Sequence, residues 1–281
     1  MSQWSLNALP DLSEEEFQEW QALLETRTGI SFDRHRHILQ TGLTQRIREV
    51  GLHSYRDYFR QVRAGAQGAA EWEALLKTLT IKETRFFRDP DAYKFLREFL
   101  LSYIPEQKTA SLELWSAACS TGEEAFSLAI LVNQCMQQLK SDKFFGVTAT
   151  DICLSTLAAA RQGKYNKRKL DVLSAPLKQK YFDEQDQYYA VKPAIKSRVC
   201  FVQANLVQMD SLPIADLDVI FCHNVLIYFS KSVQYEVLDN LVKRLRVGGV
   251  LVIGSAEAQG WRNSQAQRID NDAVQAFQRC A

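Results

Sequence analysis

The apolar positions of the first 85 residues recur every three or four residues, which is the period of amphipathic helices. A capping box opens the first of them, because Glu16 follows Ser13 at the spacing in which the two side chains and backbones exchange hydrogen bonds. An alanine- and glycine-rich stretch at residues 64–68 separates the last two. We predict helices over residues 13–29, 33–51, 54–62 and 71–79.

Beyond residue 86, a helix is expected over residues 91–103, and short apolar runs then alternate with helical patterns, as in an open α/β sheet. The first strand and helix lie in residues 112–131, LELWSAACSTGEEAFSLAIL. A small-residue turn joins them, and Thr121 or Ser120 is expected to cap the helix. Further strands are expected over residues 144–150, 199–203, 216–222, 250–254 and 273–279, with helices over residues 154–161 and 232–245.

Residues 162–198 interrupt this alternation with a polar segment rich in tyrosine and lysine. We expect two short antiparallel strands around Lys192 and Pro193, forming an inserted β subdomain. Such insertions are a common place for a substrate- or partner-recognition surface. The patterns together predict an α/β protein of two domains, with a helical N-terminal domain over residues 1–85 and a Rossmann-like domain over residues 86–281.

Composition is that of an ordinary globular protein, with 46% hydrophobic and 24% charged residues. The net charge of +1 gives no overall attraction to nucleic acid or to a membrane surface. There is no apolar run near ~18 residues and no signal-peptide pattern at the N-terminus, so we expect a cytoplasmic protein without membrane insertion. None of the six cysteines has C-x-x-C spacing, which favours reduced core residues over disulfides or a metal site.

Charge is unevenly distributed in one segment. Residues 34–63 contain seven arginines but two acidic residues. The segment is either a solvated helix surface or a docking face for an acidic protein partner. A nucleic-acid partner is disfavoured because no aromatic platform accompanies the arginines.

The turn before the helix at residue 123 indicates the kind of ligand. Only Gly122 is present where a dinucleotide site has G-x-G-x-x-G, and Glu123 and Glu124 stand where a pyrophosphate would bind. Two carboxylates favour a neutral or cationic cofactor part, such as the ammonium and sulfonium of S-adenosylmethionine. A unit of this kind is also common as plain scaffold.

Further candidates lie where strands end, because ligands of open α/β sheets bind at the carboxyl edge. Asp151 ends the second strand, where a carboxylate accepts hydrogen bonds from ribose hydroxyls, although it could instead cap the helix that follows. Cys222, His223, Asn224 and Tyr228 emerge at the C-terminal end of the strand at residues 216–222. A histidine there is more often a hydrogen-bonded turn residue than a catalytic base.

The connector at residues 80–90, TIKETRFFRDP, has an unusual composition. Two phenylalanines, Phe86 and Phe87, stand between Arg85 and Arg88. This favours a connector that packs into a cleft, whereas the simpler alternative is a surface linker with a hydrophobic anchor.

Six stretches together resemble the bacterial chemotaxis-receptor glutamate O-methyltransferases. They are KETRFFRDP, WSAACSTGEEAFSLAI, the TATDI segment with its following L, AR and GKY, the pair Asn205-Leu206, DVIFCHNVLIYF, and LRVGGVLVIGSAE. The sequence departs from the family pattern at three positions, with Lys82 for asparagine, His223 for arginine and Ser255 for histidine. The departures suggest a divergent branch that serves a pilus or another chemosensory array, and they make the residue at 223 titratable.

The resemblance implies a methyltransferase domain that uses S-adenosylmethionine, releases S-adenosylhomocysteine and methylates glutamates on the cytoplasmic helices of chemoreceptors. It implies a monomer without a metal, and an inserted subdomain that grips a receptor tether. Arg88 and Tyr228 are the implied catalytic residues. The implied cofactor contacts are Lys82, Thr84 and Arg88 in the connector, Glu124 for the amino-acid part, Asp151 for the ribose, Asn205 and Leu206 for the adenine, and Cys222 and His223 in the same cleft.

Two other functions remain open. The first is a nucleotide-dependent oxidoreductase, which the missing glycine motif and the two glutamates weigh against. The second is a non-catalytic S-adenosylmethionine-binding signalling module, which the departures at residues 82, 223 and 255 leave open.

Overall fold

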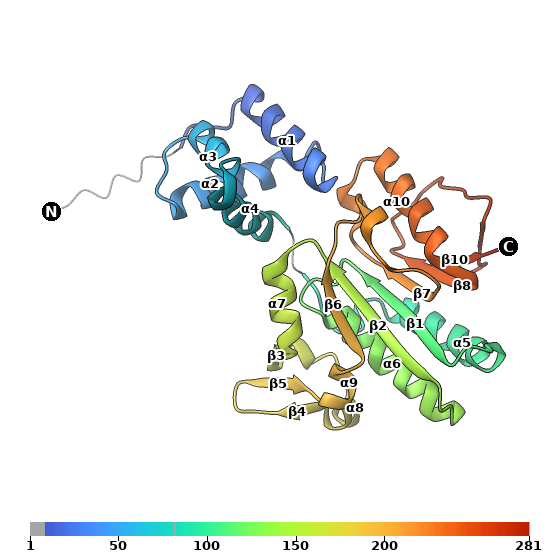
Figure 1. Ribbon diagram of the computed structural model, residues 1–281. Coiled ribbons are helices and arrows are strands. Elements are labelled where there is room, and N and C mark those ends of the chain that lie inside the picture. Colours follow the sequence, from blue (N-terminus) through green and yellow to red (C-terminus); the bar gives the residue numbers. More distant parts are fainter. Residues whose placement is uncertain (1–8, 81–82, 281) are drawn as a thin grey trace. The chain divides into compact units, whose positions relative to one another are not determined.

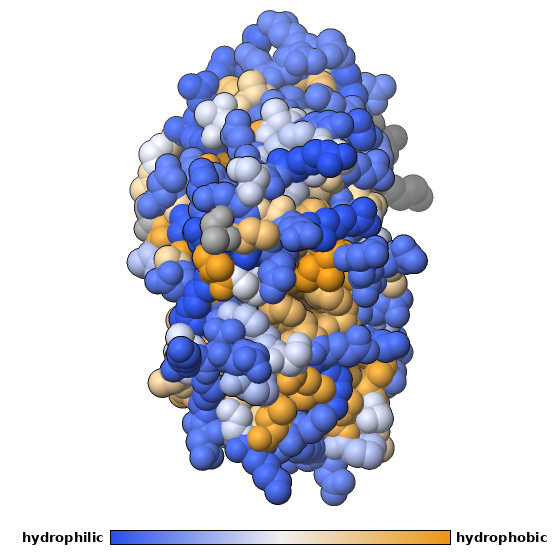
Figure 2. All heavy atoms as spheres, turned by 90° about the vertical axis from the view of Figure 1, so that its right-hand side faces the viewer, coloured by the Kyte–Doolittle hydropathy of each residue, from blue (hydrophilic) through white to orange (hydrophobic). Residues whose placement is uncertain are grey.

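The computed structural model describes residues 9–80 and 83–280, and the chain divides into two compact units, residues 1–81 and 82–281 (Figure 1). On the face drawn in Figure 2, polar side chains predominate and apolar ones gather in small patches. Among the described residues, no helix has the length and apolar character needed to cross a bilayer. Lys82, one of the expected cofactor contacts, lies outside the described residues.

The first unit consists of helices, as predicted. Trp20, Leu39, Leu43 and Leu75 are buried in it, and the expected capping box of Ser13 and Glu16 is present. Its helices are α1 Glu14–Thr28, α2 Arg36–Glu49, α3 Tyr55–Val62 and α4 Gly65–Leu79.

The last helix of this unit begins earlier than predicted. Residues 64–68 were expected to form a break, but α4 already starts at Gly65. The reason is close packing, since a Cβ on Gly68 would stand 2.6 Å from the carbonyl oxygen of Val62. Glycine at this position therefore allows the helix to approach α3, and its presence does not mark a loop.

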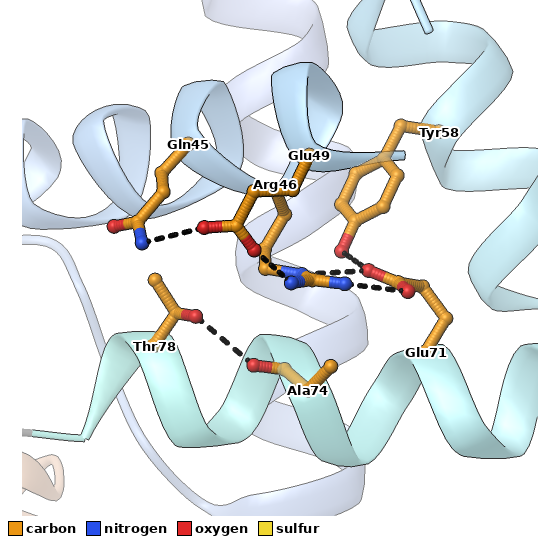
Figure 3. Close-up of polar contacts among 7 residues, drawn as sticks. All are labelled: Gln45, Arg46, Glu49, Tyr58, Glu71, Ala74 and Thr78. Carbon is orange, nitrogen blue, oxygen red and sulfur yellow. Dashed lines mark hydrogen bonds and ion pairs between the residues drawn. The ribbon is translucent and has the colours of Figure 1, made fainter. Parts of the chain in front are cut away.

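A polar cluster joins α2, α3 and α4 inside the first unit (Figure 3). The Arg46 guanidinium donates from Nε and Nη2 to the Glu71 carboxylate, at 2.9 and 2.8 Å, and also pairs with Glu49. The Tyr58 hydroxyl donates to Glu71 at 2.6 Å. Glu71 is buried, so loss of Arg46 would leave a buried carboxylate without its cation. Arg46 therefore stabilises the unit, unlike an arginine held out to solvent.

The second unit is built on a seven-stranded sheet in the order β6-β2-β1-β7-β8-β10-β9. The first five strands of this order run parallel, and β10 is antiparallel to both β8 and β9. The strands are β1 Ser111–Ala117, β2 Phe144–Asp151, β6 Val199–Gln203, β7 Leu217–Cys222, β8 Leu245–Ile253, β9 Ala266–Arg268 and β10 Gln275–Arg279. The predicted Rossmann-like α/β class is confirmed.

Helices pack against the sheet and against one another. The helix α6 packs on β1 and β2, and α5 packs on α6 (Figure 1). Pro90 opens α5, as expected, because its fixed φ suits the first helical turn. The longer helices are α5 Pro90–Glu106, α6 Glu123–Leu139, α7 Leu154–Gln162 and α10 Lys231–Arg244.

Two sequence predictions for this unit are wrong in detail. The strand β8 was expected from residue 250 but begins at Leu245, and a register shift opposite β7 accommodates the glycines at 248 and 249. Lys192 and Pro193 do not form a hairpin, because Pro193 opens the short helix α9, Pro193–Lys196. The strand that follows, β6, joins the main sheet beside β2.

The inserted segment does form a small antiparallel sheet, in the order β3-β5-β4. Tyr165 pairs with Tyr189 across β3 and β5, and Phe182 pairs with Val191 across β4 and β5. Its elements are β3 Lys164–Asn166, the 3-10 helix η1 Lys167–Leu170, α8 Ala175–Tyr181, β4 Phe182–Glu184 and β5 Tyr188–Val191.

Candidate cofactor-binding and active site

The carboxyl ends of the parallel strands carry the candidate site. The chain turns outward in opposite directions from β1 and β7, which are neighbours at the centre of the sheet. Such a switch point is where open α/β sheets bind ligands. Apart from the connector residues before α5, the residues predicted from the sequence lie at or after the ends of β1, β2, β6 and β7, so the strand order brings them to one edge.

The turn between β1 and α6 has a strained backbone. Ala118, Ser120 and Gly122 all have positive φ, at 65, 51 and 92°. Positive φ is uncommon for residues with a Cβ and often marks a functional turn. Gly122 is itself the N-cap of α6, so the prediction that Thr121 or Ser120 caps the helix is wrong. Gly122 has no room for a Cβ, which would lie 3.0 Å from the Tyr165 hydroxyl.

Glu123 and Glu124 were predicted together, but the structure separates their roles. Glu123 is fully buried and pairs with Lys169 of the inserted segment, while the Thr121 hydroxyl donates to it at 2.6 Å. It is thus a structural link between the inserted segment and the turn. Glu124 accepts a hydrogen bond from the Ser116 hydroxyl at 2.6 Å and is half-buried.

The pKa of Glu124 is raised to about 8, mainly by burial. The Ser116 hydrogen bond lowers it, the Glu257 carboxylate raises it, and Arg88 lowers it. A carboxyl held in this state is protonated at neutral pH and ionises when a cation arrives beside it. This behaviour suits the ammonium group that the sequence analysis assigned to Glu124.

Asp151, at the end of β2, is tied to the same turn. Its carboxylate accepts from the backbone N–H of Ser120 at 3.0 Å and of Cys153 at 2.9 Å. Cys153 is the N-cap of α7, so its bond to Asp151 ties this carboxylate to the start of that helix as well as to the turn after β1. Asn205 follows β6, the strand that pairs with β2. Just before it, the N–H of Ala204 donates to the backbone carbonyl of Asp151 at 3.1 Å. Asn205 is half-buried and Leu206 is buried.

Cys222 and His223 end β7. Cys222 is fully buried, which raises the pKa of its thiol well above the usual value. The ring of His223 stacks on Phe221 with centroids 4.1 Å apart, and its Nδ1 lies 3.8 Å from the Asp89 carboxylate. Its Nε2 has no hydrogen-bond partner among the described residues. This nitrogen is buried, and its hydrogen-bonding capacity is unused.

The pKa of the titratable group at position 223 is shifted far from its usual value. Burial lowers the pKa of His223 to about 3, and the charge of Arg88 contributes in the same direction. The imidazole is thus neutral across the physiological range. It supplies an aromatic surface and a neutral ring nitrogen, whereas arginine would supply a fixed charge.

Arg88 and Tyr228 approach the site from the connector and from the 3-10 helix η3, Leu226–Tyr228. Arg88 is exposed, donates to the Glu83 carbonyl at 2.8 Å, and lies close enough to lower the pKa of Tyr228. Burial is the larger effect there and raises the pKa, so the Tyr228 hydroxyl stays protonated. Thr84 is half-buried in the same connector.

Glu257 was not singled out as a site residue, yet it joins the loops after β7 and β8. It is 2% exposed and accepts hydrogen bonds from the N–H groups of Gly254, Ile227 and Asn224, at 2.9, 3.3 and 3.2 Å. These bonds fix the loop that carries Tyr228. The only sequence signal was the Ser255-Ala256-Glu257 triplet after a strand, which does not reveal a partner 30 residues away.

The described residues hold no group of three or more histidine, cysteine, aspartate or glutamate side chains that could bind a metal ion. The assembled site instead combines a protonated carboxyl at Glu124, an acceptor carboxylate at Asp151, a neutral imidazole and one guanidinium. This set can hold a cation beside a ribose without metal ligands.

Comparison with known proteins gives two family matches. Residues 82–274 match the CheR methyltransferase S-adenosylmethionine-binding domain, and residues 15–80 match the CheR methyltransferase all-alpha domain. The chemotaxis protein methyltransferase Cher2 of Pseudomonas putida is 30% identical over 86% of this chain and 90% of its own length. Chemotaxis protein methyltransferase 1 of Pseudomonas aeruginosa is 32% identical, with the same two coverages.

The enzyme of Salmonella typhimurium is also 32% identical, over 88% of this chain and 84% of its own length. Among solved structures, a TehB-like methyltransferase from Corynebacterium glutamicum is 12% identical, covers 68% of this chain and 98% of its own, and has a TM-score of 0.37.

Proposed function

This chain belongs to the CheR methyltransferase family, and we propose the residues through which it transfers a methyl group from S-adenosylmethionine to glutamates of chemoreceptors. One observation carries the assignment of residues. Arg88 lies within electrostatic reach of Glu124, His223 and Tyr228, which come from three separate segments of the chain.

The side chains at the sheet edge fit this cofactor. Glu124 would hold the ammonium of the amino-acid part from the first turn of α6, and Asp151 would accept from the ribose hydroxyls at the end of β2. Asn205 and Leu206 would flank the adenine. The free Nε2 of His223 and the buried, unpaired Oγ of Ser120 are further polar atoms that a ligand would satisfy. Cys222, Thr84 and Lys82 would complete the contacts.

Little acid–base chemistry is required of the protein. A glutamate with a pKa of ~4.3 is ionised at neutral pH, so the acceptor needs no general base. The bound cofactor supplies an electrophilic methyl on a sulfonium. What remains for this chain is to align the carboxylate and to exclude water from it, and alignment can supply about 7–11 kcal/mol.

Arg88 and Tyr228 are placed for these tasks. The Arg88 guanidinium can orient the incoming carboxylate by a bidentate pair. Tyr228 keeps its proton and can therefore donate a hydrogen bond at the reacting centre. Glu257 supports the second role, because its hydrogen bonds to the loop after β7 fix the position of Tyr228.

The helical unit is proposed to dock on the acidic receptor helix. The arginines of residues 34–63 do not all serve this purpose, since Arg46 is engaged with Glu71 and Arg36 with Glu14. Arg48 and Arg56 are exposed and stand on α2 and α3. They are the better candidates for a docking face.

The test is transfer of labelled methyl from S-adenosylmethionine to receptor-containing membranes, followed by mild base. A glutamate methyl ester hydrolyses and releases methanol, whereas N- and C-methyl groups remain attached. We expect base-labile label on a receptor-sized band. Cofactor binding in calorimetry without any transfer would support the alternative, a non-catalytic S-adenosylmethionine-binding signalling module.

A further inference from the structure

A groove lies beside the connector and separate from the strand ends. Its volume is about 420 Å³, within the range of natural ligand sites. The connector, α5, α6 and the segment before and within α8 all contribute to it. It is lined by Arg85, Phe86, Phe87, Arg88, Pro90, Gln134, Val172, Leu173 and Leu177.

The lining has a definite chemistry. Of the nine described residues that line the groove, six are apolar or proline, two are arginines and none is acidic. Arg85 is exposed, and Val172 is 56% exposed although it is a branched aliphatic residue. An occupant that satisfies both features must carry apolar side chains together with negative charge.

The backbone at Phe87 supports a role for this surface. Phe87 has φ of 48°, a left-handed conformation that is unfavourable for a bulky residue. Its N–H donates to the Ser127 hydroxyl of α6 at 3.1 Å, and its ring packs edge-on against Tyr93 at 4.8 Å. The strained turn buries Phe86 to 1% and leaves Phe87 half-buried at the groove. Strain of this kind is retained where function requires it.

The groove shares one residue, Arg88, with the candidate active site. Arg88 lines the groove and also lies within electrostatic reach of Glu124. Along α6, Gln134 of the groove stands ten residues after Glu124, a separation of about 15 Å at the helical rise. That is the length of about three turns of a bound helix.

We propose that this groove binds the acidic and apolar receptor segment that flanks the glutamate to be methylated. The inference rests on the proposed function, because it takes a receptor helix as the substrate. It assigns a specificity role to Val172 and Arg85, which lie outside the predicted catalytic and cofactor contacts. The inserted segment thereby contributes to substrate choice through Val172, next to the strained connector.

The test compares three single variants of the full chain. Val172→Glu places a negative charge in the groove, Val172→Lys places a positive one, and Val247→Glu is the matched control. Val247 is a 61% exposed valine on β8, outside the groove. The KM for the receptor, the Kd for a soluble cytoplasmic fragment of the same receptor, and the Kd for S-adenosylmethionine are measured for each variant.

We expect Val172→Glu to raise the receptor KM and the fragment Kd at least about tenfold, through lost apolar contact and charge repulsion. Val172→Lys should stay within about threefold of the wild type, since the acidic partner offsets the lost contact. Val247→Glu should match the wild type. The Kd for S-adenosylmethionine should be the same in all four proteins.

Three results overturn the proposal. The first is an equal Kd for the receptor fragment in Val172→Glu and Val247→Glu. The second is an equal loss of fragment affinity in Val172→Glu and Val172→Lys. The third is a wild type that does not bind the fragment. Failure of the proposed function is distinguishable from these. A wild type that binds the fragment but does not methylate it would refute the function, while the ratios of Kd would still decide the groove.

Discussion

Replacement of Glu124 by glutamine tests the electrostatics of the site in the most direct way. The pKa of this carboxyl rises from 4.5 to about 8 on folding, mainly because it is buried. A raised pKa in the folded state means that the stability contribution is fully present below pH 4.5 and is lost as the pH rises toward 8. Glutamine is neutral at every pH, keeps the oxygen that accepts from Ser116, and should abolish this loss.

The magnitude follows from the shift. At pH 7, about 2.5 pH units above the unfolded pKa, the loss is about 3 kcal/mol for a carboxyl shielded from water. Glu124 is half-buried, so we expect about 2 kcal/mol after screening by solvent. Glu124→Gln should therefore melt about 4–8 °C above the wild type at pH 7. At pH 5 the difference should shrink to under about 1 kcal/mol.

Cofactor binding gives a second measurement on the same variant. A cation beside Glu124 favours the ionised carboxylate, so binding at pH 7 should release up to about 0.9 proton. Calorimetry in buffers of different ionisation enthalpy measures this number. Glu124→Gln should release no proton from this position and bind S-adenosylmethionine at least about tenfold more weakly.

The matched control is Glu113→Gln, the same substitution at another half-buried site, on β1. It should bind the cofactor like the wild type. The reasoning is refuted if Glu124→Gln is no more stable than the wild type at pH 7, or if its cofactor affinity and proton release are unchanged. A stabilised variant that has lost cofactor affinity would show that this site is maintained at a cost in stability.

Four further results are expected. Arg88→Ala should reduce turnover at least about 100-fold without unfolding the protein, and near wild-type activity would exclude its role in alignment. Tyr228→Phe should lower kcat with little change in the cofactor Kd, and unchanged kinetics would leave Tyr228 as a packing residue. Wild-type stability should fall as the pH drops from 6.5 toward 3, because His223 is protonated in the unfolded chain over this range but stays neutral in the folded one, where its pKa is about 3. Thermal melts of His223→Gln should show a smaller fall in stability over the same range. Arg48→Glu should raise the receptor KM, more at low salt, and leave the cofactor Kd unchanged; circular dichroism should show that Arg46→Glu disrupts the helical unit instead.

Much of the architecture was predictable because it depends on local patterns. Period and capping located α1 and α3, and Pro90 marked the start of α5. The apolar runs predicted the parallel strands, and their carboxyl ends then identified the edge with Asp151 and His223. These inferences succeeded because each requires only residues that are close in sequence.

The errors arose where a distant contact overrode the local signal. Gly68 predicted a break, but α4 continues through it. Glycine is needed there because a Cβ would collide with the carbonyl oxygen of Val62. Lys192 and Pro193 resembled a hairpin, yet the strand after them pairs with β2, more than forty residues earlier. Turn propensity could not reveal either partner, because both depend on how the elements pack.

The sequence by itself determined the order of elements, the family and the residue types at the strand ends, because those follow from periodicity and motif spacing. Only the tertiary structure decided which of those residues carry charge and which are already engaged by other side chains. It showed that Arg46 is bound by Glu71, and that burial raises the pKa of Glu124 and lowers the pKa of His223. The physical reason is that a pKa and a partner depend on burial and on charges contributed by remote segments, and these exist only after the chain has packed.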